Sequence, residues 1–522
     1  MNTQQYEPYL SIPKEKFQIA KQDDKLHDIK LDTKPVGYFR DAFKRFCKNK
    51  ASVAAAIIIL LIVLYAFLVP LFTFKYDSTF LDVYYSKLGP RNLALSKIGL
   101  ARAGITRDCD ERTYMYYLGL GIAAEDPDGK GATWQDGENS KYNAVLGIKD
   151  EYEFAGTKRY ELKIESYYEK GFIYMQITPD EFNKIIAWEK ESGLKVIYPY
   201  IDTTNDYCYD STDANFWYKS DKKLNPIVTS SGTDVAIKKA GQLQLEDNYL
   251  RDDNGNVLYY VNKGGSSSTE PARSVRIFYY NYYVYKNGFE PEYLLGTDSQ
   301  GYDLSLRLAQ GIQLSLLVAV AVSAINLTLG ALYGAVEGYY GGAVDMTLER
   351  ISDILSGIPF IIVATLFQMH LASKVGTIPS LLFAFVLTGW IGTASTVRTQ
   401  FYRFKNQEYV LAARTLGAKD FRIMFKHILP NALGTIITSS VLVIPGVIFS
   451  ESMLSYLGIV KLGGTNGTSL GTLLSDASGI WTSYPHLMIV PAVVISLLMI
   501  SFNLFGNGLR DAFNPSLRGS ED

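Results

Sequence analysis

The chain has 522 residues, of which 48% are hydrophobic and 20% are charged, and its formal net charge is −2. This length exceeds the roughly 100–200 residues of one domain, so it predicts more than one structural unit. The near-neutral charge argues against the basic field that nucleic-acid binding requires, and we expect no nucleic-acid partner. Four histidines and three cysteines are little material for a Cys/His metal site or a His-based catalytic centre, so we expect neither.

Long uncharged runs predict six membrane-spanning helices. The first run, Ala51–Phe74, has 24 residues, or about 36 Å of helix, and crosses a hydrocarbon core of about 30 Å. It begins too late and is too long for a cleaved signal peptide, so we interpret it as an uncleaved span. The other five predicted spans are Gly311–Val336, Ile354–Ser373, Val375–Val397, Ile428–Ser450 and about Pro485–Phe505.

The distribution of positive charge predicts the orientation of these spans. Residues 398–426 hold seven Lys or Arg, whereas 374–379 and 461–483 hold one each. By the positive-inside rule, 398–426 is cytoplasmic and the other two loops lie outside. Six spans then place both termini in the cytoplasm and residues 75–295 outside a multi-pass protein of the plasma membrane.

Residues 75–295 predict a separate domain. They carry 33 acidic and 27 basic residues and 26 of the 38 tyrosines. A helix is expected after Thr178, which begins a capping box and is followed by Pro179, with Gly193 closing the helix. Lys195–Tyr200, Asn256–Val261 and Val275–Tyr285 are typical of strands. We expect an α+β or mostly-β domain, in which the tyrosines fill strands and half-buried surfaces in preference to forming a binding surface.

Two cysteines of this domain, Cys109 and Cys208, lie on the same predicted side of the membrane. A disulfide between them would close a loop of about 100 residues and add up to roughly 4.7 kcal/mol in the chain-entropy description. Two free thiols are the alternative, and the sequence does not decide between them.

The chain contains no G-x-x-x-x-G-K-[ST] phosphate loop, so we expect it to bind no ATP by that route. Its informative segment is the cytoplasmic loop 398–432. This loop predicts two short helices separated by Gly417, the second with an apolar face of Phe421, Met424, Phe425 and Ile428. Such a loop is either a docking element for another protein or an amphipathic helix lying on lipid.

At this loop the sequence resembles the E-A-A-x3-G-x9-I-x-L-P signature of ABC-importer permeases. The matching positions are Ala412, Ala413, Gly417, Leu429 and Pro430. Leu411 replaces the signature Glu and His427 replaces its first Ile, and Glu408, one turn earlier, is the candidate substitute for the lost carboxylate.

Four further segments resemble the oligopeptide/dipeptide permease C subunit of these importers. They are Gly296–Asp303, where Tyr302 replaces the family's Arg, Gly338–Gly342, Glu451–Gly458 and Phe502–Asp511. The resemblance covers 296–518 with the N-terminal tail and first span, but it does not cover 75–295.

The resemblance implies a six-helix transmembrane subunit of an importer for oligopeptides or dipeptides that is not itself an enzyme. It implies as partners a second permease subunit, two ABC ATPase subunits that bind ATP and Mg²⁺, and an extracellular substrate-binding lipoprotein. No cofactor is expected on this chain itself. The residues implied in coupling to the ATPases are Glu408, Ala412, Ala413, Gly417, Phe421, Met424, Phe425 and Pro430.

Several alternatives stay open from the sequence. The solute could instead be a metal chelate or another small molecule, and the chain could be a membrane-anchored extracellular receptor or a secondary transporter. Candidate residues of a translocation path are Asn326, Gln368, Glu451 and Asn503. For Glu451 we favour a position near the outer interface, where its span ends.

The expected layout joins these inferences. It assigns 1–50 to a cytoplasmic tail, 51–74 to the first span, 75–295 to an extracellular insertion, 296–310 to an extracellular segment, 311–510 to the permease core and 511–522 to a cytoplasmic tail.

Overall fold

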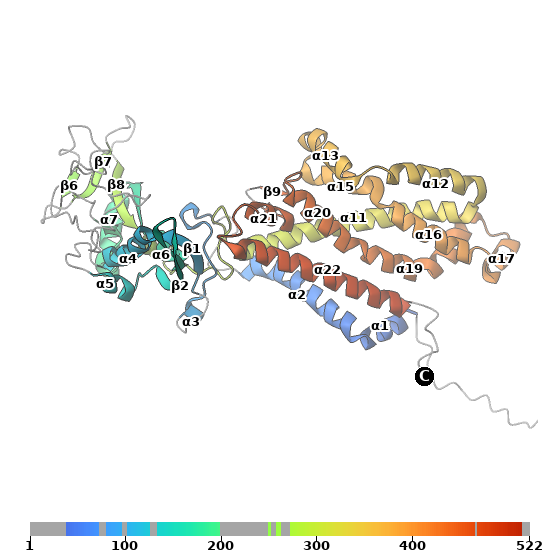
Figure 1. Cartoon of the computed structure of the whole chain (residues 1–522). Helices are drawn as coiled ribbons and strands as arrows, with labels where there is room; N and C mark the ends of the chain where they lie inside the picture. The colour runs from blue at the N-terminus through green and yellow to red at the C-terminus, as the bar shows by residue number, and fades with distance from the viewer. Residues whose placement is uncertain are drawn as a thin grey trace, which may run out of the picture.

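The computed structural model describes residues 38–72, 80–96, 102–125, 133–198, 249–251, 257–262, 272–464 and 467–513. These residues form a helical bundle and an α+β domain that follow each other along the long axis of the molecule (Figure 1). The domain, which we call the inserted domain, comprises the described residues between helices α2 (Lys50–Phe72) and α11 (Leu304–Tyr340).

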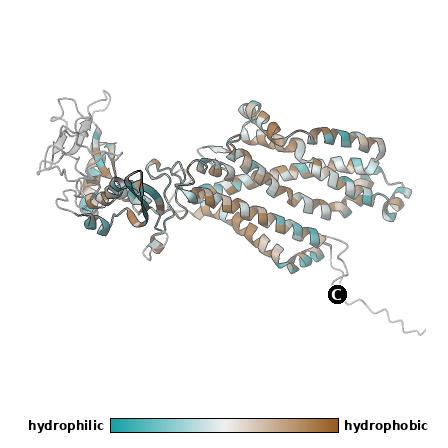
Figure 2. Cartoon of the chain, in the orientation of Figure 1, coloured by the Kyte–Doolittle hydropathy of each residue, from teal (hydrophilic) through white to brown (hydrophobic). Residues whose placement is uncertain are grey.

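The bundle supplies the predicted membrane helices. Five of its described helical stretches are long and apolar enough to span a membrane, and a bent helix pair makes up to six. Figure 2 shows hydrophobic residues along these helices. The bundle helices besides α2 and α11 are α1 (Tyr38–Lys48), α12 (Gly342–Ser356), α13 (Phe360–His370), α14 (Ala372–Val375), α15 (Thr377–Gly389), α16 (Ile391–Phe404), α17 (Glu408–Thr415), α18 (Asp420–Arg422), α19 (Leu429–Val441), α20 (Val443–Tyr456), α21 (Leu470–Ala477) and α22 (Pro485–Phe513).

The third predicted span, Ile354–Ser373, is not one continuous helix in the structure. Helices α12 and α13 bend by 72° where one ends at Ser356 and the other begins at Phe360. Pro359 stands in this break and precedes α13 directly. Proline lacks an amide donor and disfavours helical backbone at the residue before it, so the apolar run continues through the break while the helix does not.

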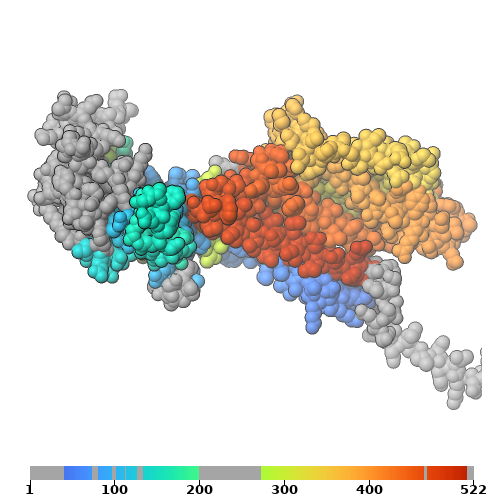
Figure 3. Space-filling view, in the orientation of Figure 1, coloured from blue at the N-terminus to red at the C-terminus, as the bar shows by residue number. Residues whose placement is uncertain are grey.

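Small residues allow the bundle helices to approach closely. Gly330, Gly334 and Gly338 recur every fourth residue on the face of α11 that packs against α16. A Cβ at Gly334 would overlap the Ala394 carbonyl, and one at Gly338 would overlap the Phe401 side chain. This spacing of small residues is a common packing device of membrane helices. Figure 3 shows α2 and α22 side by side on one face of the bundle, where they also pack together.

The inserted domain contains two antiparallel sheets. The first has the order β1-β3-β2, and the second has the order β4-β8-β7-β6 with β5 also paired to β8. The strands are β1 (Gly104–Asp110), β2 (Val145–Phe154), β3 (Thr157–Glu165), β4 (Phe172–Ile177), β5 (Ile197–Tyr198), β6 (Tyr249–Arg251), β7 (Val257–Asn262) and β8 (Ala272–Phe278). Its helices are α3 (Leu93–Ser96), α4 (Glu111–Glu125), α5 (Trp134–Asn139), α6 (Ser166–Glu169), α7 (Pro179–Ser192) and α10 (Tyr279–Asn287), with a short 3₁₀ turn at Val83–Tyr85. The predicted α+β content is confirmed for the described residues.

Local sequence signals in this domain differ in how well they predict structure. Helix α7 has the predicted cap, because the Thr178 side chain accepts from the Glu181 amide, and Gly193 ends the helix with a φ of +71°. The predicted strand Val275–Tyr285 is wrong after Phe278, where α10 begins. In α10 the buried residues Tyr279, Tyr280 and Tyr283 follow a helical repeat, so tertiary packing overrides the strand preference of tyrosine.

Tyrosines form much of the interior of the inserted domain. Tyr85, Tyr167, Tyr198, Tyr283 and Tyr293 are among its largest fully buried side chains. We expected tyrosine mainly at half-buried and strand positions. The structure also places many tyrosines in the core of the domain.

A buried ion pair lies among these tyrosines. The Arg91 guanidinium lies 3.6 Å from the Glu165 carboxylate, and its carbon stands 4.8 Å from the Tyr167 ring centre and 5.4 Å from that of Tyr280. Burial raises the pKa of Glu165 to about 7, and the attraction of Arg91 only partly opposes it. This pair holds the last residue of β3, Glu165, against the segment around Arg91 that follows α2.

Cys109 lies in β1, is buried and forms no disulfide with any described residue. Burial and the neighbouring carboxylates of Asp110 and Asp108 raise the pKa of this thiol to about 12. Its proposed partner, Cys208, lies outside the described residues, so the disulfide stays a prediction.

The segment Gly296–Asp303 joins the inserted domain to α11. The Thr297 hydroxyl donates to the Tyr85 carbonyl at 2.6 Å and accepts from the Leu88 amide at 2.8 Å. Asp303 caps α11 by accepting from the Ser305 amide at 2.8 Å. The family-like motif of this segment is therefore a structural joint between the domain and the bundle.

Tyr302, which replaces the family's Arg, takes part in the same joint. Its ring lies 4.0 Å from the guanidinium carbon of Arg307, and Arg307 pairs with Asp298 at 3.3 Å. The aromatic face thus supports a buried cation that the motif's aspartate neutralises.

Candidate functional site

The loop with the permease signature lies at the end of the bundle away from the inserted domain, where Figure 1 labels α17. Helix α17 ends at Thr415, Gly417 follows with a φ of +80°, and α18 begins at Asp420. The predicted pair of short helices around a left-handed glycine is confirmed. A Cβ at Gly417 would meet no atom within 4 Å, so only its backbone conformation requires glycine.

A tyrosine at the end of α11 holds this loop. The Tyr339 hydroxyl donates to Asp420 Oδ1 at 2.6 Å and accepts from Arg414 at 3.4 Å. Lys405 reinforces the contact by donating to the Gly338 carbonyl at 2.9 Å. The two short helices are therefore both tied to one long membrane helix.

The second short helix changes to π-helical turns over Ile423–Ile428 before α19 begins. Hydrogen bonds of the π type span five residues and rotate the following side chains relative to an α-helix. Ile423, Met424 and Ile428 are buried in a cluster with Val397 and Phe401. Met424, which the sequence assigned to the docking face, is thus packed within the chain itself in this structure, and its role in docking stays a prediction.

Leu416 and Phe421 are the most exposed of the large apolar side chains that the described loop presents. Leu416 is 87% exposed and Phe421 is 70% exposed. The Phe421 ring contacts the half-buried Phe425 ring, with centres 4.5 Å apart and the ring planes tilted by 39°. We call Leu416, Phe421 and Phe425 the loop patch; it retains two of the predicted docking residues and adds Leu416.

The remaining residues implied in coupling lie on α17 and at the start of α19. Glu408 and Ala412 are exposed on α17, Ala413 is half-buried, and Pro430 is exposed in the first turn of α19. Pro430 is the second residue of α19, a position at which its missing amide donor is tolerated.

Sequence reasoning missed a charged cluster on the same half of the bundle. Arg398 on α16 donates to Asp345 at 2.6 Å and to Glu349 at 2.6 Å, and Tyr402 donates to Asp345 at 2.7 Å. Together these bonds join α12 to α16. The signal was present as charges within or beside apolar runs, but the pairing partners lie about 50 residues apart.

The four candidate path residues lie on four different helices. Glu451 is 1% exposed and accepts from Ser315 at 2.9 Å and from Ser455 at 3.1 Å. It is enclosed by α11, α20 and the neighbouring α21, where a Cβ on Gly471 would overlap Ser452. Buried hydroxyl donors satisfy its carboxylate oxygens, as burial of a charged group requires.

The other three differ in their surroundings. Asn326 is buried on α11, beside Gly389, and its Oδ1 has no hydrogen-bond partner among the described residues. Gln368 donates to the Thr377 carbonyl at 3.1 Å, and Asn503 donates within its own helix to Met499 at 2.8 Å. The structure does not gather these residues into one site, so their role in a path stays a prediction.

Comparison with known proteins shows the family of this chain. The family described as "Binding-protein-dependent transport system inner membrane component" matches residues 326–519, and "N-terminal TM domain of oligopeptide transport permease C" matches residues 37–90. The oligopeptide transport system permease protein OppC of Bacillus subtilis (strain 168) is 40% identical over 227 residues, which cover 44% of this chain and 73% of that protein. The dipeptide transport system permease protein DppC of Lactococcus lactis subsp. cremoris (strain MG1363) is 38% identical over 242 residues, covering 46% of this chain and 68% of that protein.

A chain of the MetNI methionine ABC transporter in an inward-facing conformation is 18% identical, with a TM-score of 0.34, over 40% of this chain and 96% of that chain. A likeness at this score supports no further conclusion. The sequence relatives and the matched families are sufficient by themselves, and the chain belongs to the family of oligopeptide and dipeptide transport permease C subunits, within the inner-membrane components of binding-protein-dependent ABC importers.

Proposed function

We propose that this chain imports oligopeptides or dipeptides as one of two permease subunits of an ATP-driven transporter. It forms half of the translocation path with an OppB/DppB-like subunit. Two ABC ATPase subunits bind ATP and Mg²⁺, and an extracellular lipoprotein delivers the peptide. The names of the relatives support the peptide substrate, because oligopeptide and dipeptide systems are 38–40% identical to this chain.

The observation that carries the coupling role is the loop patch on a rigidly held loop. Exposed leucine and phenylalanine side chains on a well-anchored surface mark an interaction site. Tyr339 makes hydrogen bonds with Asp420 and Arg414 and so ties both halves of the loop to α11; we call these two bonds the clamp. A helix that lies on lipid does not need such a clamp, so the clamp favours docking to a protein over the lipid alternative. The occupant that fits the family is an ATPase subunit.

The orientation is part of the proposal. The loop 398–426 carries seven basic residues, and the inserted domain lies at the opposite end of the bundle (Figure 1). The positive-inside rule then places α17 in the cytoplasm and the inserted domain outside the plasma membrane, with both termini inside. A cysteine introduced at Asn406 should resist a membrane-impermeant maleimide in intact cells, and one introduced at Phe154 should react; the reverse result contradicts this topology.

The coupling role is tested on the assembled transporter. Phe421→Asp should insert normally into the membrane, yet lose co-purification of the ATPases and peptide uptake, because a charge would be buried in the interface. Phe154→Asp is a matched control, since Phe154 is 65% exposed on the inserted domain. Phe421→Leu should keep most of the association. Normal ATPase association in Phe421→Asp would refute docking at the loop patch.

A further inference from the structure

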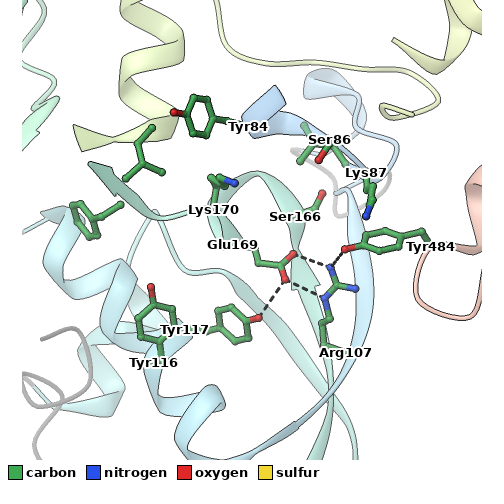
Figure 4. A pocket seen from close by; sticks show the side chains of 13 residues that line it. Tyr84, Ser86, Lys87, Arg107, Tyr116, Tyr117, Ser166, Glu169, Lys170 and Tyr484 are labelled. Atoms are coloured by element: carbon green, nitrogen blue, oxygen red, sulfur yellow. Dashed lines mark hydrogen bonds and ion pairs between the residues drawn. The ribbon is translucent and has the colours of Figure 1, made fainter. Parts of the chain in front are cut away.

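A cavity of about 420 Å³ lies where the inserted domain meets the start of α22. Figure 4 shows Lys87 and Tyr484 on one side of it and Tyr116 and Tyr117 on the other. Its volume lies within the range of about 300–1,000 Å³ of small-molecule sites. None of its residues belongs to the loop patch or to the four path candidates.

The floor of the cavity is a fixed polar cluster. Arg107 pairs with Glu169 through two nitrogens, at 3.0 and 3.3 Å, and Tyr117 donates to the same carboxylate at 3.2 Å. Arg107 also donates to the Tyr484 hydroxyl at 2.6 Å. Glu169 is therefore occupied by its own neighbours and neutralises Arg107.

Among the described residues, two further cations reach the cavity, and Glu169 is the only carboxylate that lines it. Lys87 and Lys170 leave this described lining with a net formal charge of +2 after Arg107 and Glu169 cancel. The segment 75–295 as a whole has a net charge of −6, from 33 acidic and 27 basic residues. A positive cavity in an acidic domain favours an anionic ligand.

Lys87 is held in a way that points to binding. Its φ is +62°, which is uncommon for a residue with a side chain. Its amide donates to the Asp298 carbonyl at 2.9 Å, and the next amide donates to Thr297 at 2.8 Å, so the joint imposes this backbone. Strained backbone of this kind often accompanies functional side chains.

The Lys87 ammonium lies 5.7 Å from the centre of the Tyr484 ring and makes no hydrogen bond with any described residue. The hydroxyls of Tyr84 and Ser86, which also line the cavity, likewise lack a hydrogen-bond partner within the described part of the chain. One cation and two hydroxyl donors thus face the same space with their hydrogen-bonding capacity unused. This set matches the oxygens of a carboxylate.

Apolar side chains complete the lining. Leu88, Phe172 and Ile173 border the cavity together with the ring of Tyr116. An inorganic anion would leave these surfaces without a partner. A carboxylate attached to an apolar or aromatic group uses both parts of the lining.

We propose that this cavity binds the C-terminal carboxylate of a peptide whose last side chain is apolar or aromatic. Lys87 holds the carboxylate with the hydroxyls of Tyr84 and Ser86, and the apolar wall takes the side chain. The choice of a peptide rests on the proposed function, whereas the need for a carboxylate rests on the cavity alone. Because Tyr484 directly precedes α22, the bound ligand contacts both the inserted domain and the last membrane helix.

The test measures binding of the peptide Ala-Ala-Phe and of its C-terminal amide to the full chain in lipid nanodiscs by calorimetry. The free acid should bind at least about tenfold more tightly than the amide, since a hydrogen bond between charged groups is lost in the amide. Lys87→Met should remove this preference and Lys87→Arg should retain it. Lys141→Met is the matched control, because Lys141 also lies over a tyrosine, 4.7 Å from the Tyr142 ring centre, but outside the cavity.

Equal binding of acid and amide, absence of acid binding, or an unchanged preference in Lys87→Met would each overturn the proposal. Binding of inorganic phosphate by the chain, combined with no binding of either peptide, would overturn it too. Peptide uptake by the wild-type transporter separates the two levels of inference. Uptake with no acid preference in the cavity refutes only the cavity, and absence of peptide uptake refutes the transport function.

Discussion

Removal of the Tyr339 hydroxyl should loosen the loop 398–432, which we call the coupling loop, without unfolding the bundle. Tyr339→Phe keeps the ring in its cluster with Phe401 and Val410 but deletes the donor to Asp420. A hydrogen bond to a charged group contributes about 1.5–3 kcal/mol, and the exposure of Asp420 reduces this to about 1 kcal/mol. If this energy holds the loop in its docking geometry, the affinity for the ATPase should fall about fivefold.

The assay is titration of purified ATPase subunits onto the permease pair in nanodiscs, followed by peptide-stimulated ATP hydrolysis. Tyr340→Phe is the matched control, because Tyr340 is 52% exposed and its hydroxyl makes no hydrogen bond with a described residue. Thermal stability of the bundle should be the same in both variants. Equal ATPase affinity in Tyr339→Phe and Tyr340→Phe would refute the clamp.

Three further outcomes are expected. Gly417→Val should weaken ATPase association more than Gly417→Ala, since a β-branched residue at a φ of +80° is strained by about 1–3 kcal/mol; equal effects would argue against backbone strain. Cys109 should react slowly with iodoacetamide at pH 8, because burial and two neighbouring carboxylates raise the pKa of its thiol to about 12. After denaturation without reductant it should react fully; a thiol that reacts only after reduction would show a disulfide. The folded-state pKa of Glu165 is about 7 and its ordinary value is 4.5, so the folded chain holds a proton that the unfolded chain releases, and stability should fall as pH rises from about 4.5 to 7. Glu165→Gln should flatten this fall in a thermal-unfolding series, and an unchanged slope would contradict the assignment.

Features set by a few neighbouring residues were predictable from the sequence. Gly417 has the expected left-handed backbone, and Thr178 and Gly193 bound a helix as their capping chemistry requires. The apolar runs also located the membrane helices, because hydrophobic length is a local property. Their ends were less well placed, since α11 runs on to Tyr340, beyond the last residue of the predicted span.

Features set by distant contacts were not predictable in this way. The π-helical turns over Ile423–Ile428 and the packing of Met424 against residues of α16 and α17 involve contacts between separate helices, which a local repeat does not report. The contact between Tyr339 and Asp420 joins residues 81 positions apart. Lys87 carries no motif at all, and its place in a cavity arises only when the joint at Thr297 and the start of α22 meet.

Helix α11 links the two regions that have a proposed function, the coupling loop and the joint beside the cavity. Its 37 residues correspond to about 56 Å of continuous helix. At its start, Asp303 and Arg307 fix it to the joint below the inserted domain, and at its end Tyr339 holds the coupling loop.

Between these ends, the glycines of α11 lie so close to α16 that a Cβ at Gly334 would overlap Ala394 and one at Gly338 would overlap Phe401. A rigid element bound at both ends transmits displacement only as a whole, through sliding or tilting. Loop movement driven by ATPases would therefore reach the joint beside the cavity as motion of this one helix, with no need for a chain of side-chain rearrangements through the bundle.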